Sequence, residues 1–216
     1  MGIRADGSST VFDHEAERRH ELRSALFGIE ASAHGLSYAQ ATLTRSQFDQ
    51  LTSALVYEVR RVRSMIEGRV GGATTFDLAS VIAPAIISAQ ASGQQVHCDV
   101  PSGLLVDGCA DTATQVVVAL LHNARRHAPG APVEVHGYAS RGAVHLAVDD
   151  AGPGIPWWLR RRVFERGVSR ETSGGSGLGL FIARRLMTEQ GGSITVRPRK
   201  GGGASFLLRF VSAEPR

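Results

Sequence analysis

The sequence of 216 residues predicts an α-helical hairpin, which pairs with a second copy into a dimeric four-helix bundle, followed by an α/β sandwich. Two observations predict this architecture. Apolar residues in the first third recur in steps of three and four, as in bundle helices. The remainder mixes helical and strand patterns without regular βαβ alternation, which favours a sandwich. Two glycine clusters, at 152–154 and 174–179, also lie in this second part.

Composition is that of an ordinary soluble globular protein, with 43% hydrophobic and 20% charged residues. The longest apolar run, Val116–Leu121, is far shorter than the ~20 residues that span a bilayer. Since no leader pattern begins the chain, we expect a cytoplasmic location without a membrane span. The net charge of +4 comes from scattered arginines with few aromatic residues, so we expect no nucleic-acid partner. Neither the cysteines nor the histidines show the spacing of a transition-metal site.

Residues 1–10 are rich in glycine and serine and predict a flexible N-terminus. Residues 11–68 predict the hairpin, with helices over about 11–36 and 45–67 and a polar connection between them. The apolar seams are formed by Leu22, Leu26, Ile29, Ala33 and Leu36 in the first helix and by Phe48, Leu51, Leu55, Val62 and Ile66 in the second. Each helix of a single hairpin leaves its stripe uncovered, so two chains are expected to form a homodimer.

Residues 69–75 contain Gly71-Gly72 and predict a linker, and residues 76–213 predict the second domain. Helices are predicted at about 78–91, 111–127, 157–164 and 177–190, and strands at about 95–100, 104–107, 133–138, 143–149, 193–196 and 204–211. The last two strands are expected to form a hairpin that turns at Gly201–Gly203.

The two glycine clusters predict a nucleotide site. The first follows a strand that ends in Asp149-Asp150, and the second, Gly174–Gly179, runs into a helix. Glycine allows a ligand to approach the backbone closely, because it has no side chain. A helix N-terminus offers unpaired N–H groups and a positive dipole end to a phosphate.

A third element is the helix end that carries Asn123, Arg126 and His127 within about one turn of each other. An amide oxygen suits Mg²⁺, and arginine and histidine can bind phosphate oxygens. Taken alone, this segment is equally well explained as a solvated helix end with favourable cations at its C-terminus.

Four segments, taken in order, resemble the N, G1, F and G2 boxes of the GHKL (Bergerat) ATPase fold. They are Asn123 to His127, Asp150-x-Gly-x-Gly, Phe164 and Gly175-x-Gly-Leu-Gly-Leu. The best match is the catalytic domain of bacterial sensor histidine kinases, over about residues 76–211. The resemblance implies ATP and Mg²⁺ as cofactors. It also implies a cytoplasmic chain, either complete or the cytosolic portion of a membrane-bound sensor.

The resemblance assigns roles by position. Asp150 is expected to accept a hydrogen bond from the adenine amino group, and Asn123 to coordinate Mg²⁺. The segment 165–173 would be a mobile lid whose Arg166 and Arg170 approach the triphosphate. The remaining nucleotide contacts are expected from Arg126, His127, Gly152, Gly154, Gly175, Gly177, Leu178 and Gly179.

In the hairpin, the segment that begins with His20 resembles the family's H-box. His20 lies two residues from the seam position Leu22, about 200° around the helix, and so should face solvent as a phosphoacceptor. Glu21 is expected to hold the imidazole tautomer and take up its proton, and Ser24 to orient water for dephosphorylation of the partner. His14 fits the box less well. The alternative for His20 is an ordinary exposed histidine.

The resemblance therefore implies an ATP-dependent protein histidine kinase of a two-component system. It would phosphorylate His20 and pass the phosphoryl group to an aspartate in the receiver domain of a response regulator. The alternatives are a degenerate GHKL nucleotide-binding regulator and a serine-directed kinase of the anti-sigma type. Ala25, Ala119 and Ala151 replace residues that the family usually has, and Ala119 brings efficient Mg²⁺ binding into question. A coiled-coil scaffold would leave the glycine boxes unexplained.

Two further segments have simpler interpretations. Trp157 and Trp158 are expected to pack beneath the lid, and a docking surface is the alternative. The run Arg160–Arg162 is expected to be a solvated helix face.

Overall fold

The structure, a computed structural model, describes residues 74–168 and 177–213 and isolated helical positions before them. These positions are Leu22, Leu26, Gly28–Ala31, Ala33, His34, Ser37, Phe48, Thr52, Leu55, Val59 and Val62. The chain divides into two compact units, Met1–Val70 and Gly71–Arg216, and the division falls in the predicted linker. No helix within the described ranges is long and apolar enough to cross a membrane.

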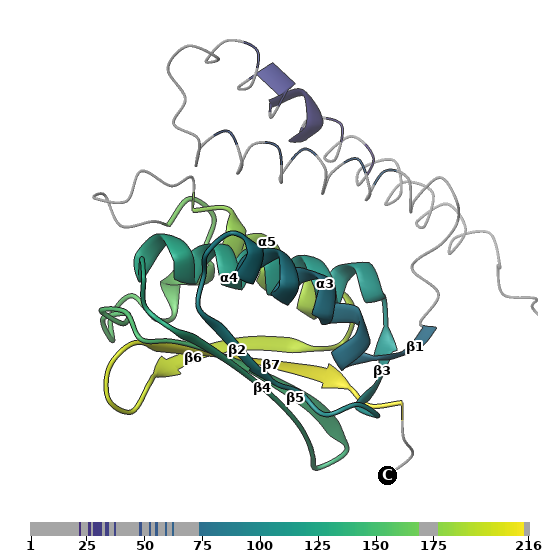
Figure 1. Ribbon diagram of the computed structural model, residues 1–216. Helices are drawn as coiled ribbons and strands as arrows, with labels where there is room; N and C mark the ends of the chain where they lie inside the picture. The colour runs from purple at the N-terminus through teal and green to yellow at the C-terminus, as the bar shows by residue number, and fades with distance from the viewer. Residues whose placement is uncertain are drawn as a thin grey trace, which may run out of the picture. The chain divides into compact units, whose positions relative to one another are not determined.

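A five-stranded sheet forms one layer of the second unit (Figure 1). In spatial order the strands are β2 (Val96–Asp99), β4 (Val133–Ser140), β5 (Ala143–Asp150), β7 (Ala204–Val211) and β6 (Ser193–Pro198). Strand β2 runs parallel to β4, and every other neighbouring pair is antiparallel. The turn between β4 and β5 is Arg141-Gly142, and both residues have positive φ, as in a tight type I′ hairpin.

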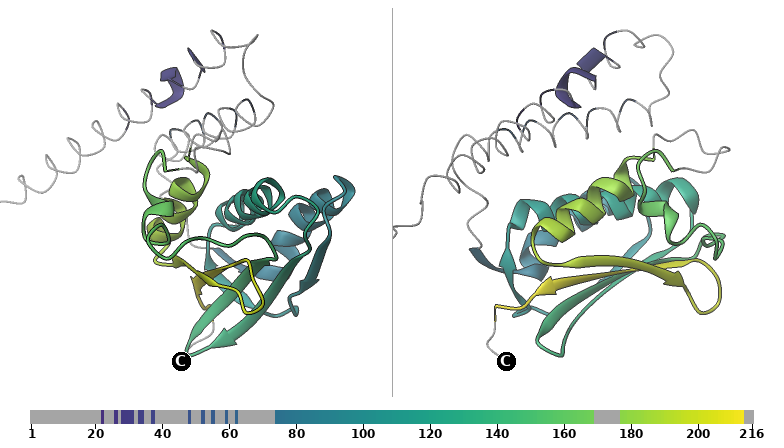
Figure 2. Two further views of the ribbon diagram at one scale, coloured as in Figure 1. Left: turned by 90° about the vertical axis from the view of Figure 1, so that its left-hand side faces the viewer. Right: turned by 180° about the vertical axis from the view of Figure 1, so that it is seen from behind.

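Three helices cover one face of this sheet, as the views in Figures 1 and 2 show. They are α3 (Leu78–Ala91), α4 (Ala110–His127) and α5 (Gly179–Glu189). The core lies between the layers, where alternate residues of the strands meet the apolar stripe of α4. The buried strand residues include Val144, Leu146, Val148, Phe206, Leu208 and Phe210, and those of α4 are Ala113, Val116, Val117, Leu120, Leu121 and Ala124. The predicted α/β sandwich is confirmed.

Asp77 sets the start of α3 and ties it to a nearby loop. Its Oδ1 accepts the backbone N–H of Ser80 at 3.1 Å, and its Oδ2 accepts the N–H of Gly103. Asp77 also ends β1 (Thr74–Asp77), which pairs antiparallel with β3 (Leu105–Gly108) in a separate two-stranded sheet. The predicted linker 69–75 therefore overlaps a strand, because the backbone of β3 provides partners for residues 74 and 75.

The prediction of an α-helix at 157–164 is wrong. The segment consists of turns followed by a single 3₁₀ turn, η1 (Arg162–Phe164). Its bonds close mostly over three residues, as from the N–H of Leu159 to the carbonyl of Pro156, 3.0 Å away. The expectation that the tryptophans pack beneath the lid is also wrong, because Trp157 and Trp158 are 76% and 62% exposed.

Candidate nucleotide-binding site

Asp150 is the best-defined polar group of the site. It ends β5 and points to the helix-covered face, where it is only 7% exposed. Its Oδ1 accepts the backbone N–H of Gly152 at 3.0 Å and that of Ala204 at 3.3 Å. Burying a carboxylate is costly unless donors satisfy it, and these two bonds supply donors. One carboxylate oxygen is therefore held by the backbone, which fixes the orientation of the group.

Gly152 brings this carboxylate next to the C-terminal end of α4. A Cβ at Gly152 would lie 2.6 Å from the Cβ of Ala128, the residue that follows α4. Only glycine permits this approach without displacing one of the two segments. The sequence predicted Gly152 as a pocket residue, whereas its contact with Ala128 requires the fold to be seen.

The turn between β6 and β7 closes over the same cluster. A Cβ at Gly154, where φ is +70°, would lie 2.8 Å from the carbonyl oxygen of Gly203. A Cβ at Gly203, where φ is +100°, would lie 1.8 Å from the carbonyl oxygen of Asp150. Sequence reasoning assigned Gly203 only to a hairpin turn, and its GGG run gave no sign of this second contact.

Asn123, Arg126 and His127 lie in the last turns of α4, and all three side chains are half-buried. Partial burial lowers the pKa of the Arg126 guanidinium, because desolvation disfavours its charge. Together with Arg125, Arg126 and His127 make the last turn basic, which complements the negative end of the helix dipole. The helix end that carries these residues lies against the first glycine cluster, where Ala128 meets Gly152.

The second glycine cluster leads into α5. Gly177 has a φ of +64°, and a Cβ there would lie 2.5 Å from the carbonyl carbon of Gly167 and 2.6 Å from the N of Val168. Leu178 is the N-cap of α5 and gives it no side-chain cap, and the first turn holds no acidic residue. The first N–H groups of α5 thus have no side-chain acceptor on the helix itself, which suits an anion.

Gly179 differs from Gly177. A Cβ there would meet no atom within 4 Å, so this glycine is not required by packing in the described part of the chain. Gly175 lies outside the described residues, as do His20, Glu21, Ser24 and Arg170. Arg166 is exposed.

Phe164 anchors the segment between the glycine clusters. It is 6% exposed and packs edge-to-face against Phe206 of β7, with ring centroids 6.5 Å apart. The guanidinium of Arg184, on α5, lies over the Phe164 ring at 5.9 Å. One aromatic side chain therefore joins this segment to both the sheet and α5.

Known proteins share this arrangement. Residues 108–214 match the family described as histidine kinase-, DNA gyrase B-, and HSP90-like ATPase. The probable sensor histidine kinase TcrY of Mycobacterium tuberculosis is 31% identical over 93% of this chain and 46% of its own length. The signal transduction histidine-protein kinase AfsQ2 of Streptomyces coelicolor is 31% identical over 90% of this chain and 41% of its own length. This chain carries the catalytic core of a sensor histidine kinase.

The fold agrees with this assignment. The structure of the mycobacterial sensor histidine kinase MprB superposes with a TM-score of 0.59 at 27% identity, covering 65% of this chain and 97% of that one. The second unit is therefore an ATP-binding domain of the GHKL type. The chain spans less than half the length of the two curated relatives named above.

Proposed function

We propose that this chain is an ATP-dependent protein histidine kinase of a two-component system, which phosphorylates its own His20. One observation carries the nucleotide half of this proposal. Asp150 is a buried carboxylate fixed by the N–H groups of Gly152 and Ala204, directly beside the end of the helix that carries Asn123. A fixed, negatively charged acceptor in a low-dielectric setting favours a hydrogen-bond donor such as the adenine amino group.

The chain fits a bound triphosphate with Mg²⁺. Asn123 offers an amide oxygen, a ligand type that Mg²⁺ accepts, and the metal commonly takes most of its other ligands from phosphates and water. One turn earlier, Ala119 offers no ligand atom, so Asn123 is the side chain assigned to the metal. Bound Mg²⁺ would neutralise the developing phosphate charge. At Gly179, no atom of the described residues lies within 4 Å of a Cβ position, which supports room for the phosphates beside the first turn of α5.

In the proposed transfer, each bond that forms is matched by a bond that breaks. The neutral imidazole of His20 attacks the γ-phosphorus, the bond from that phosphorus to the β–γ bridging oxygen breaks, and ADP leaves. Glu21 takes up the proton that the imidazole loses. The phosphoryl group then passes from His20 to an aspartate of a receiver domain. In a separate reaction, Ser24 orients a water molecule that hydrolyses this aspartyl phosphate and releases inorganic phosphate. Positioning and charge neutralisation supply most of the rate enhancement.

The proposal includes a homodimer formed through the hairpin 11–68. Leu26 and Phe48, two of the predicted seam residues, are 51% and 47% exposed in the single chain. Because apolar surface of this kind is removed from water when a second hairpin packs on it, these exposures support a four-helix bundle.

The decisive experiment incubates the full chain with γ-labelled ATP and Mg²⁺ beside His20→Gln and Asn123→Ala variants. We expect label that is stable in base and labile in acid, present in the wild type and lost in both variants. Label that survives His20→Gln would overturn His20 as the acceptor.

The absence of a ligand at Ala119 favours one other candidate, a nucleotide-binding regulator without phosphotransfer. This candidate predicts that the wild type binds ATP but acquires no label. Acid-stable label on a protein substrate would instead identify a serine-directed kinase. Restoring an acidic residue with Ala119→Glu provides a direct comparison, since it should increase the labelling rate only if the kinase reaction is Mg²⁺-limited.

A further inference from the structure

A cluster of metal-binding side chains lies on the face of the sheet that the helices leave open. Glu134 and Asp149 are directly opposite each other in the β4–β5 register, and His136 is two residues along β4 on the same face. The buried residues of these strands, such as Val135 and Val148, alternate with them and point to the helices. The cluster is therefore on the opposite side of the sheet from Asp150 and the nucleotide site.

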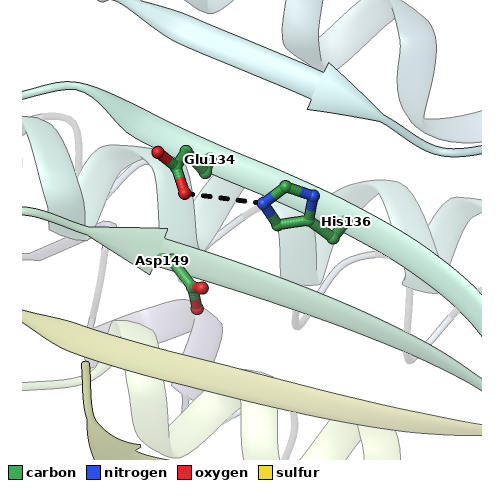
Figure 3. Close-up of side chains that lie close together, drawn as sticks. All are labelled: Glu134, His136 and Asp149. Atoms are coloured by element: carbon green, nitrogen blue, oxygen red, sulfur yellow. Dashed lines mark ion pairs between the residues drawn. The ribbon is translucent and has the colours of Figure 1, made fainter. Parts of the chain in front are cut away.

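The three side chains lie close together (Figure 3). One ligand atom from each lies within 4.8 Å of the others, and the Nε2 of His136 is 3.5 Å from the Oε2 of Glu134. Two ligands bound tetrahedrally at 2.0–2.1 Å from a zinc ion are about 3.3 Å apart. The His136–Glu134 pair is already near that spacing. Rotation of the side chains can bring the ligand atom of Asp149 to a similar distance from the other two.

A second observation points to a missing cation. The Oδ1 of Asp149 is buried and has no hydrogen-bond partner among the described residues. A buried carboxylate oxygen without a donor is destabilising, and a bound cation removes that cost. Glu134 and His136 contact each other, whereas the structure gives Asp149 no ion pair with any residue that it describes.

The local charge suits a divalent ion. Glu134 also pairs through its Oε1 with Arg199, 3.0 Å away, which leaves its Oε2 facing His136. The side chain can therefore bind a metal through one oxygen and keep Arg199 on the other. The two carboxylates and one guanidinium together carry a net charge of −1, and a divalent cation reverses the sign of this charge.

We propose that Glu134, His136 and Asp149 form a binding site for a divalent transition-metal ion, of which Zn²⁺ is the representative. One imidazole with two carboxylates is a ligand set that zinc accepts, with water in the fourth position. The sequence shows no such site, because its three ligands come from two strands and meet only through the hairpin register.

The test is a titration of the full chain with Zn²⁺ against a chromophoric chelator, without nucleotide. We expect saturable binding of one ion per chain, weakened about tenfold or more by His136→Asn and by Asp149→Asn. Cys98→Ser and His145→Asn are the matched controls. Cys98 is an exposed thiol on the neighbouring strand β2, and His145 is an imidazole stacked on Tyr138 on the same face as the cluster. Neither control should change the affinity.

Co²⁺ provides a second readout, because its visible spectrum reports the ligand type directly. A spectrum of a nitrogen- and oxygen-ligated ion that is lost in His136→Asn supports the site. Zn²⁺ affinity that is the same in wild type and His136→Asn, or that is lost in Cys98→Ser, would overturn the proposal. Circular dichroism of each variant separates a lost ligand from a lost fold.

Discussion

The Oδ1 of Asp150 accepts the backbone N–H of Ala204 at 3.3 Å, across 54 residues of sequence. These residues are also register partners in the β5–β7 ladder. The same oxygen accepts the N–H of Gly152 at 3.0 Å. The carboxylate that we assign to adenine recognition is thus also a structural bridge between two strands and the first glycine cluster, and substitutions can separate these two roles.

We expect Asp150→Asn to lose ATP binding while the fold is largely retained. Its amide oxygen can still accept the N–H groups of Gly152 and Ala204, but the NH₂ group presents donors to the adenine amino group, itself a donor. Asp150→Ala should lose both roles and destabilise the domain by about 1–3 kcal/mol. Thermal unfolding and titration with a fluorescent ATP analogue distinguish the two. Equal destabilisation by both variants would contradict the separation of roles.

The two glycines at the start of α5 are expected to respond oppositely to alanine. Gly179→Ala should stabilise the free protein by about 0.5–1 kcal/mol, because it adds helix propensity where a Cβ meets no atom of the described residues within 4 Å. The same methyl group should weaken ATP binding if the phosphates approach this turn. Gly177→Ala should destabilise the free protein, because its Cβ would overlap the backbone of Gly167 and Val168. Chemical denaturation with and without ATP measures both effects.

Removing the assigned metal ligand should affect only Mg²⁺-dependent binding. In Asn123→Ala we expect ATP affinity in EDTA to match the wild type, and the increase on adding Mg²⁺ to fall by about tenfold. Arg125→Ala is the matched control, since Arg125 is exposed in the same turn of α4 and has no assigned role. Isothermal titration in both buffers tests this. An unchanged Mg²⁺ increment in Asn123→Ala would remove Asn123 from the metal site.

Asp77 should make the domain sensitive to acid. The N–H groups of Gly103 and Ser80 lower the pKa of this carboxyl below its usual value, because they stabilise the charged form. The folded state then binds the proton less well than the unfolded state. The stabilisation is therefore present above the unfolded pKa and is lost as the pH falls below about 4.

Asp77→Ala should cost about 0.5–2 kcal/mol at neutral pH, as expected for loss of an N-cap. The difference from wild type should be smaller at about pH 3, because below the usual aspartate pKa of about 4 the unfolded state binds the proton more readily than the folded state. Urea unfolding at the two pH values checks this. A difference that does not depend on pH would mean that the hydrogen bonds do not require the charge.

Local patterns predicted the elements that bury an apolar face. The helix Leu78–Ala91 and the strand Ala143–Asp150 agree with their predicted ranges to within a residue, because apolar periodicity encodes them. The segment 157–164 was misassigned, since its buried residues, Val163 and Phe164, are adjacent rather than spaced by three or four. Strand β1 was missed because four residues after a glycine pair carry little local signal, and its partner β3 lies about thirty residues away.

For the candidate site too, local sequence patterns indicated some residues, whereas contacts between distant segments could not be predicted. The sequence motifs indicated Asp150, Gly152 and Asn123, because their spacing resembles that of a known family. The contacts of Gly152 with Ala128 and of Gly203 with Asp150 depend on chain segments far apart in sequence, so no local pattern could reveal them. The cluster of Glu134, His136 and Asp149 depends on cross-strand register and was missed for the same reason.

The opposite orientations of the last two residues of β5 limit where this domain can gain or lose residues. Asp149 and Asp150 are consecutive and point to opposite faces of the sheet, and the two-residue turn Arg141-Gly142 sets their alignment with β4. Deleting or inserting one residue in that hairpin would exchange the two carboxylates between faces. Length variation among evolving or engineered versions of this domain should therefore be tolerated in other surface loops and excluded between Ser140 and Asp150.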